Sequence, residues 1–152
     1  MAVYQIVETG DEILRMPAKK IEKITPNVGK LLDNLRDTLE ASETGVGLAA
    51  PQIGISKRAI VVSYEEEYYE LINPEIVSKE GEDTDTEGCL SVPGVLGEVT
   101  RAVKVQVVGL NRQGEEVKIK AEGFLARIFQ HEIDHLEGIL FIDRAEKIRR
   151  VE

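Results

Sequence analysis

Hydrophobic side chains recur at helical spacing in two segments of the chain. From Thr25 to Thr44 the apolar positions are three or four residues apart, and Thr25 followed by Pro26 is typical of a helix start. A second segment, from about Glu122 to Glu137, has the same period and is followed by Gly138, a residue type that often ends helices. We therefore predict two main helices. The apolar positions of the first are Val28, Leu31, Leu32, Leu35 and Leu39.

Strand patterns fill the region between these helices. Residues 58–64 contain a β-branched run, and residues 70–73 and 75–77 are typical of two short strands on either side of Pro74. Residues 103–107 and 117–121 alternate apolar and polar side chains around a turn, which predicts a hairpin with one buried face. The order of helix, strands and helix predicts an α+β fold rather than a doubly wound sheet.

Length and composition fit one globular domain. The chain of 152 residues lies in the single-domain range, so we expect one domain over residues 1–152. No apolar run approaches the roughly 18 residues of a membrane span, and the N-terminal residues lack an export signal, which favours a cytoplasmic location. With 28 acidic and 19 basic side chains, the formal charge of −9 disfavours nonspecific binding to nucleic acid.

Both histidines of the chain lie in the second predicted helix, in the sequence His131-Glu132-Ile133-Asp134-His135. At about 100° per residue, His135 and Glu132 fall within roughly 100° of His131, on the apolar side of the helix. Burying an unpaired carboxylate costs several kcal/mol, and a divalent cation would offset that cost. Histidines one turn apart can bind one ion, while the adjacent glutamate contacts a water on that ion. The opposite, solvated side is predicted to hold Arg127, Gln130, Asp134 and Glu137.

A metal site with two histidines needs a third protein ligand. In many zinc proteases this ligand is a downstream Glu or His, and the downstream candidates here are Glu137, Asp143 and Glu146. The competing candidate is Cys89, the only cysteine, which lies between Gly88 and a proline-containing segment that suggests a loop or strand end. An isolated cysteine is more often a small buried residue, but these surroundings and the missing ligand favour Cys89.

Three segments together resemble the motifs of the peptide deformylase family. They are residues 45–52 (Gly-Val-Gly-Leu-Ala-Ala-Pro-Gln), 87–91 (Glu-Gly-Cys-Leu-Ser) and 130–136 (Gln-His-Glu-Ile-Asp-His-Leu), in the family's order. The resemblance also covers residues 71–74 and the predicted hairpin. It implies a catalytic domain of small mixed or antiparallel sheets packed around a central helix with the HExxH motif. The implied reaction removes the formyl group from the N-terminal formyl-methionine of nascent chains.

The resemblance also implies roles for individual residues. Cys89, His131 and His135 match the metal ligands, and Glu132 matches the general acid/base that takes a proton from the attacking metal-bound water. Gln52 and the backbone N–H of Leu90 match the groups that stabilise the oxyanion. The family implies Fe²⁺ as the physiological ion, with Zn²⁺, Ni²⁺ or Co²⁺ also able to bind, whereas spacing alone favours Zn²⁺.

A peptide substrate needs a backbone partner and a pocket for methionine. An extended peptide beside Gly47 would add as a strand, and the alternative for Gly45 and Gly47 is a tight turn with positive φ. Helix geometry directs the head of Arg127 into solvent. Glu87 and Arg101 form either a pair near Cys89 or two exposed charges. The predicted substrate-binding residues are Val46, Gly47, Gly88, Phe124 and Ile128, with the His131 ring beside them.

Two other functions stay open at this stage. One is a small zinc endopeptidase with Glu or Asp as third ligand, and the other is a noncatalytic metal- or peptide-binding domain. The expected partners are formyl-methionyl peptides, with no membrane and no specific nucleic acid. Longer bacterial members have a C-terminal helix to which ribosome contact is attributed. Because only nine residues follow Asp143, we expect a solvated tail there, with at most transient ribosome contact through Lys147, Arg149 and Arg150.

Overall fold

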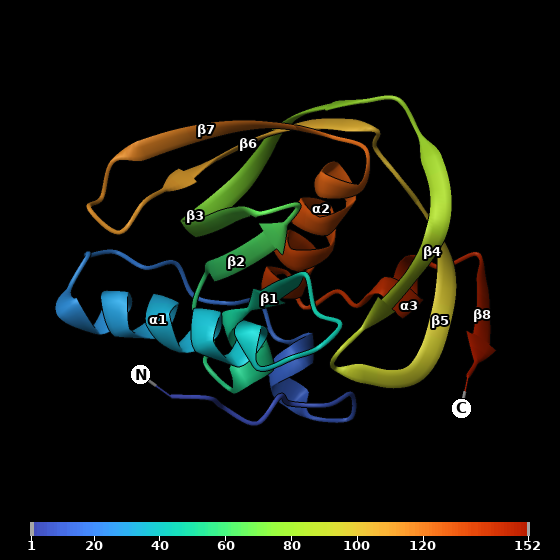
Figure 1. Ribbon diagram of the computed structural model, residues 1–152, viewed down its shortest axis with the longest axis horizontal. Helices are drawn as coiled ribbons and strands as arrows, with labels where there is room; N and C mark the ends of the chain where they lie inside the picture. The colour runs from blue at the N-terminus through green and yellow to red at the C-terminus, as the bar shows by residue number, and fades with distance from the viewer. Residues whose placement is uncertain (1, 152) are drawn as a thin grey trace.

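The computed structural model describes residues 2–151, in which strands form a larger and a smaller sheet (Figure 1). Neighbouring strands are antiparallel in both sheets, so the predicted α+β class is confirmed. The larger sheet has the order β1-β2-β3-β6-β7, formed by Gly47–Ala49, Ala59–Tyr64, Glu67–Glu80, Lys104–Leu110 and Glu116–Glu122. The smaller sheet has the order β4-β5-β8, formed by Asp83–Cys89, Val92–Arg101 and Lys147–Arg150.

Both predicted helices are present, with slightly different ends. Helix α1 covers Pro26–Glu40 and begins at Pro26 as predicted, but it ends before the predicted Thr44. Helix α2 covers Phe124–Leu136, and Gly138 beyond it has φ 76°, as expected of a residue that ends a helix. The short elements are α3 (Phe141–Arg144) and the 3-10 turns η1 (Glu12–Arg15) and η2 (Ala50–Ile53). None of the helices within residues 2–151 is long and apolar enough to span a membrane.

The larger sheet lies between the two main helices. Ile60 and Val62 of β2 belong to the core cluster that contains α2, whereas Ala59 and Val61 belong to the cluster that contains α1. All four side chains are fully buried. Coverage of both faces explains why this strand is an unbroken apolar run without alternation.

The smaller sheet lies on another side of α2, next to α3 (Figure 1). Val92 and Val99 of β5 pack with Leu140 and Phe141 in a third, smaller core cluster. Helix α2 is therefore central, with the larger sheet and the smaller sheet around it. This arrangement brings the end of β4 next to the helix that holds both histidines.

The strands differ from the sequence predictions in three places. The two short strands around Pro74 are one long strand, β3, with a register shift between Ile72 and Glu75. The β4-β5 hairpin was not predicted, because β4 is mostly exposed and its polar residues show no alternation. The predicted solvated tail is also wrong in part. Residues 147–150 are exposed, but their backbone pairs with β5 as strand β8.

Candidate active site

Helix α2 holds three polar side chains on its buried side. His131, Glu132 and His135 have exposed fractions of 9%, 4% and 1%. Their burial agrees with the face predicted from the helical period. Glu132 has one carboxylate oxygen, Oε1, that is buried without a hydrogen-bond partner among the described residues. Such an orphaned acceptor indicates that a further group belongs in this site.

The end of strand β4 brings Cys89 to the two histidines. The Cys89 sulfur lies 3.4 Å from Nε2 of His135, and one donor atom from each of Cys89, His131 and His135 lies within 4.8 Å of the others. Within residues 2–151 this is the one group of such residues close enough to hold an ion. The alternative ligands have other partners: Glu137 pairs with Arg58, Asp143 with Arg15, and Glu146 accepts a hydrogen bond from Thr100.

The environment shifts the pKa values of these groups in different directions. Burial raises the pKa of the Glu132 carboxyl to about 7. Burial also holds the pKa of His135 well below its usual range. Burial lowers the pKa of His131 as well, but hydrogen bonds with Cys89 and Glu87 outweigh it and hold that pKa well above the usual range. Glu132 is therefore able to take up and release a proton near neutral pH.

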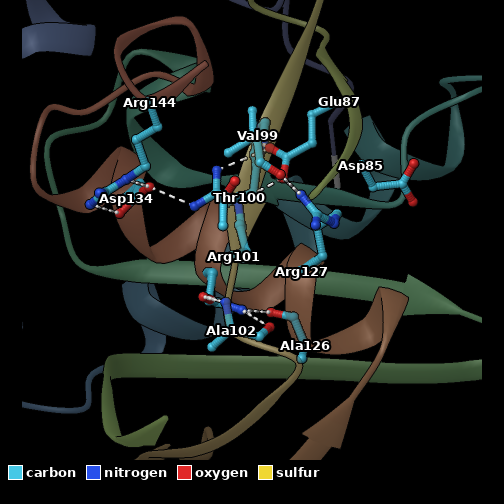
Figure 2. A network of polar contacts seen from close by, with 12 residues as sticks. Asp85, Glu87, Val99, Thr100, Arg101, Ala102, Ala126, Arg127, Asp134 and Arg144 are labelled. Carbon is cyan, nitrogen blue, oxygen red and sulfur yellow. Dashed lines mark hydrogen bonds and ion pairs between the residues drawn. The ribbon is translucent and has the colours of Figure 1, made fainter. Parts of the chain in front are cut away.

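A buried carboxylate orients His131 from behind. Oε1 of Glu87 accepts a hydrogen bond from Nδ1 of His131 at 2.9 Å, which leaves Nε2 directed to the site. Arg101 donates two hydrogen bonds to Glu87, at 2.6 and 3.0 Å, and a third to Asp134 (Figure 2). Although burial raises the pKa of Glu87, the hydrogen bonds from His131 and Arg101 lower it to about 2. The predicted pair of Glu87 and Arg101 is confirmed, and the alternative of two exposed charges is wrong.

The prediction that the head of Arg127 lies in solvent is wrong. Arg127 has an exposed fraction of 5% and donates to Oε2 of Glu87 at 2.6 Å (Figure 2). It also donates to the backbone oxygens of Val99 and Asp83, both at 2.8 Å. Gln130 is buried too, through hydrogen bonds with the backbone of Ala102. The helical wheel assigned these side chains to solvent, but β4, β5 and Ala102 in the β5–β6 connection cover them.

Gln52 lies in η2, opposite Cys89. Its Oε1 accepts a hydrogen bond from the backbone N–H of Ala49 at 2.9 Å. Its Nε2 donates to Oγ of Ser91 at 3.1 Å and lies 3.6 Å from the Cys89 sulfur. Gln52 is buried beside the three candidate ligands, and Leu90 lines the same cleft. Sequence reasoning missed Ser91, although the resemblance to residues 87–91 included it.

Cys89, His131 and Glu132 line a cleft of about 540 Å³. Residues 44–47, 86–90 and 92–96 line it together with residues of α2. Gly45 and Gly47 do not have positive φ, so the tight-turn alternative is wrong. A side chain at Gly47 would instead collide with Glu132, since its Cβ would lie 2.7 Å from Oε2. The cleft is lined by all five predicted substrate-binding residues, Val46, Gly47, Gly88, Phe124 and Ile128.

Comparison with known proteins identifies the family. A model of the family described as polypeptide deformylase matches residues 3–151. The chain belongs to the peptide deformylase family. Members of this family are hydrolases with a metal centre, and this chain is therefore a hydrolase as predicted.

Individual deformylases are similar over nearly their whole length. The peptide deformylase of Carboxydothermus hydrogenoformans is 65% identical over 150 residues, which are 99% of this chain and 98% of the relative. The crystal structure of the deformylase from Thermotoga maritima has a TM-score of 0.92 and 40% identity, with 97% of this chain and all of that chain covered. A Met-Ala-Ser bound deformylase from Acinetobacter baumannii has a TM-score of 0.89 and 38% identity, with 94% and 98% covered.

The residues present fit the metal centre that the family implies. One thiolate and two imidazoles are a donor set that Zn²⁺, Fe²⁺, Co²⁺ and Ni²⁺ all accept. Three protein ligands leave a further coordination position, as catalytic metal sites require. The unpartnered oxygen of Glu132 lies beside the same cleft, where a water on the ion would satisfy it. Chemistry and burial therefore make this group the candidate site for a divalent cation.

Proposed function

We propose that this chain removes the formyl group from formyl-methionyl peptides at a divalent cation held by Cys89, His131 and His135. The observation that supports this most is the convergence of these donor atoms within 4.8 Å of one another, next to buried Glu132. A bound ion of this kind lowers the pKa of a coordinated water to near 7 and polarises a carbonyl oxygen. We further propose Fe²⁺ as the native ion, with Zn²⁺, Ni²⁺ or Co²⁺ as substitutes.

Glu132 moves the protons in this proposal. Its carboxylate accepts a proton from the attacking water and later donates it to the amine nitrogen that leaves. Burial raises the pKa of Glu132 to about 7, so the carboxyl exchanges a proton at neutral pH without a large free-energy cost. Gly47 leaves just enough space for this carboxylate, because a Cβ there would lie 2.7 Å from Oε2.

Gln52 and Leu90 stabilise the negative charge that develops on the formyl oxygen. Nε2 of Gln52 and the backbone N–H of Leu90 are the donors in this proposal. An amide donor does not need to transfer a proton, and loss of one such donor raises the activation free energy by about 3 kcal/mol. Gln52 is buried and held by hydrogen bonds at both ends of its carboxamide, so it requires little reorganisation during the reaction.

The substrate lies along the cleft in an extended conformation. Its backbone pairs beside Gly47 of β1, and Gly88 on the other wall leaves room for it. The methionine side chain enters the apolar part of the cleft, which Val46, Phe124 and Ile128 line. The Met-Ala-Ser peptide in the relative from Acinetobacter baumannii supports a site that takes a methionine followed by further residues.

Other parts of the proposal concern the chain as a whole. We propose that residues 1–152 act as one catalytic domain in the cytoplasm, where nascent chains are available. Contact with the ribosome stays a prediction. The exposed strand β8 with Lys147, Arg149 and Arg150 offers a small basic surface for it.

The decisive experiment compares amine release from formyl-Met-Ala-Ser and acetyl-Met-Ala-Ser by anaerobically prepared protein. The proposal predicts turnover of the formylated peptide at least about 100-fold faster, and equal turnover of both peptides contradicts it. Two variants separate the alternative functions. Glu132→Gln retains the ion and loses turnover, whereas a noncatalytic binding domain has no turnover to lose. Cys89→Ala loses the ion, whereas an endopeptidase with an acidic third ligand retains it.

A further inference from the structure

We propose that Ser91 is a positioning residue for Gln52, whose side-chain amide it holds in the one orientation that presents an N–H to the reacting oxygen. The inference rests on the proposed role of Gln52 as an oxyanion donor. Ser91 is fully buried, and its hydroxyl lies 3.1 Å from Nε2 of Gln52.

The hydrogen bonds around Gln52 determine which end of its carboxamide points which way. Oε1 accepts from the backbone N–H of Ala49, so a flipped amide would place two donors against each other. The flipped amide would also direct Oε1 toward the sulfur of Cys89, which repels it when the sulfur is a thiolate. One N–H of Nε2 donates to Oγ of Ser91, and the other donates to the Cys89 sulfur at 3.6 Å, which directs it to the side of the cleft.

Ser91 itself is fixed on two sides. Its backbone N–H donates to the Cys89 sulfur at 3.4 Å, and its backbone oxygen accepts from the N–H of Thr9 at 2.7 Å. Val7 lies two residues before Thr9, and its backbone N–H donates to the backbone oxygen of Gln52 at 2.7 Å. Residues 7–9 therefore link the backbones of Gln52 and Ser91 and set the distance between them.

The Ser91 hydroxyl acts on Gln52 and not on the metal ligand. The contact of Ser91 with Cys89 uses the backbone N–H, which remains when the side chain is changed. Removal of the hydroxyl leaves the Nε2 proton unpaired in a buried place, and the carboxamide gains alternative orientations. We expect a lower kcat at unchanged metal content, with little effect on KM.

The first test compares Ser91→Thr with Ser91→Val. The two side chains have the same shape and add the same volume, but only threonine retains the hydroxyl. We expect kcat of the valine variant to be about three- to tenfold below that of the threonine variant, the range for one hydrogen bond. In a Gln52→Ala background the two variants should differ by less than about twofold, because the group that Ser91 positions is gone. Equal kcat for both variants, or the same ratio in both backgrounds, overturns the proposal.

The second test does not depend on turnover. The side-chain NH₂ signals of Gln52 are recorded by NMR in zinc-loaded protein, which is diamagnetic, and are assigned from their loss in Gln52→Ala. In the unchanged protein we expect slow hydrogen exchange of these protons, and in Ser91→Val faster exchange and a shifted signal. Fast exchange in the unchanged protein, or identical signals in Ser91→Val, overturns the proposal. If instead the protein has no deformylase turnover but the NMR result is as expected, the proposed function fails and the role of Ser91 in orienting Gln52 stands.

Discussion

Replacement of Glu87 by glutamine removes one negative charge from the most highly connected buried group in the site. Glu87 accepts hydrogen bonds from Arg101, Arg127 and His131, and its side chain has an exposed fraction of 5%. Glutamine has the same shape, but its side-chain NH₂ would face the N–H donors of Arg101, Arg127 or His131 in place of a carboxylate oxygen. The change removes the negative charge that the guanidinium groups of Arg101 and Arg127 share. It also weakens the hydrogen bond that orients the ring of His131.

Two lines of reasoning give a similar loss of unfolding free energy for Glu87→Gln. The pKa of Glu87 is lowered from its usual value of 4.5 to about 2, which corresponds to roughly 3 kcal/mol of stabilisation of the folded state. Removal of one partner from a buried ion pair costs about 3–5 kcal/mol in other proteins. For a domain of this size, a loss of about 3 kcal/mol lowers Tm by roughly 6–12 °C. Loss of a group that orients a metal-bound histidine lowers metal affinity by about 10- to 100-fold.

The assay is urea unfolding at pH 7 together with a zinc titration against a chelator of known affinity. The matched control is Asp85→Asn, which removes an exposed carboxylate from the same strand, two residues away. We expect the control to unfold within about 0.5 kcal/mol of the unchanged protein. If Glu87→Gln has the same unfolding free energy and the same zinc affinity as the control, the hydrogen bonds of Glu87 with Arg101, Arg127 and His131 do not stabilise the site.

Three further outcomes follow from particular contacts. Gly47→Ala should lower kcat/KM about 100-fold, because the new Cβ would lie 2.7 Å from Oε2 of Glu132 and would displace that carboxylate. The control is Gly29→Ala in α1, where a Cβ would have nothing within 4 Å. It should stabilise the fold by about 1 kcal/mol and leave turnover unchanged. Equal activity of the two variants would falsify the packing argument. Because the folded-state pKa of Glu87 is lowered, its stabilising contribution is present above about pH 4.5 and is lost as the pH falls through about 2. As the pH is lowered, the unfolding free energy should therefore decrease more steeply for the unchanged protein than for Glu87→Gln. Parallel curves for the two proteins would contradict the stabilising role of the Glu87 charge. Chelation should lower the Tm of the unchanged protein but leave Cys89→Ala unaffected, since a ligand of the folded state stabilises by about 4 kcal/mol at 1,000 times its Kd. A chelation-induced shift of the same size in both proteins contradicts the ligand assignment.

The elements with strong periodicity were predictable, and so was the core of the site. The two histidines lie one helical turn apart on the buried side of α2, where the period places them. Cys89 followed from the need for a third ligand, and the structure brings it to the same place. The placement of these side chains was predictable because it depends on local geometry and on simple coordination chemistry, and their role as metal ligands stays a prediction.

The parts that failed depend on contacts between distant segments. Arg127 appeared to face solvent because a helical wheel cannot show that β4 and β5 cover that side of α2. Strand β8 was not predicted because its side chains are exposed, and only its backbone pairing with β5 defines it. Ser91 carried no signal of its own, since a lone serine after Cys89 reveals its contact with Gln52 only once η2 and the β4-β5 turn are side by side.

The absorption spectrum of Co²⁺-loaded protein shows whether one thiolate and two imidazoles of this chain share a divalent cation, because thiolate coordination produces a charge-transfer band in the near ultraviolet. We expect one cobalt ion per chain with this band in the unchanged protein, and loss of both the band and tight binding in Cys89→Ala. Stoichiometric cobalt binding without the band, or an unchanged spectrum in Cys89→Ala, would contradict this expectation.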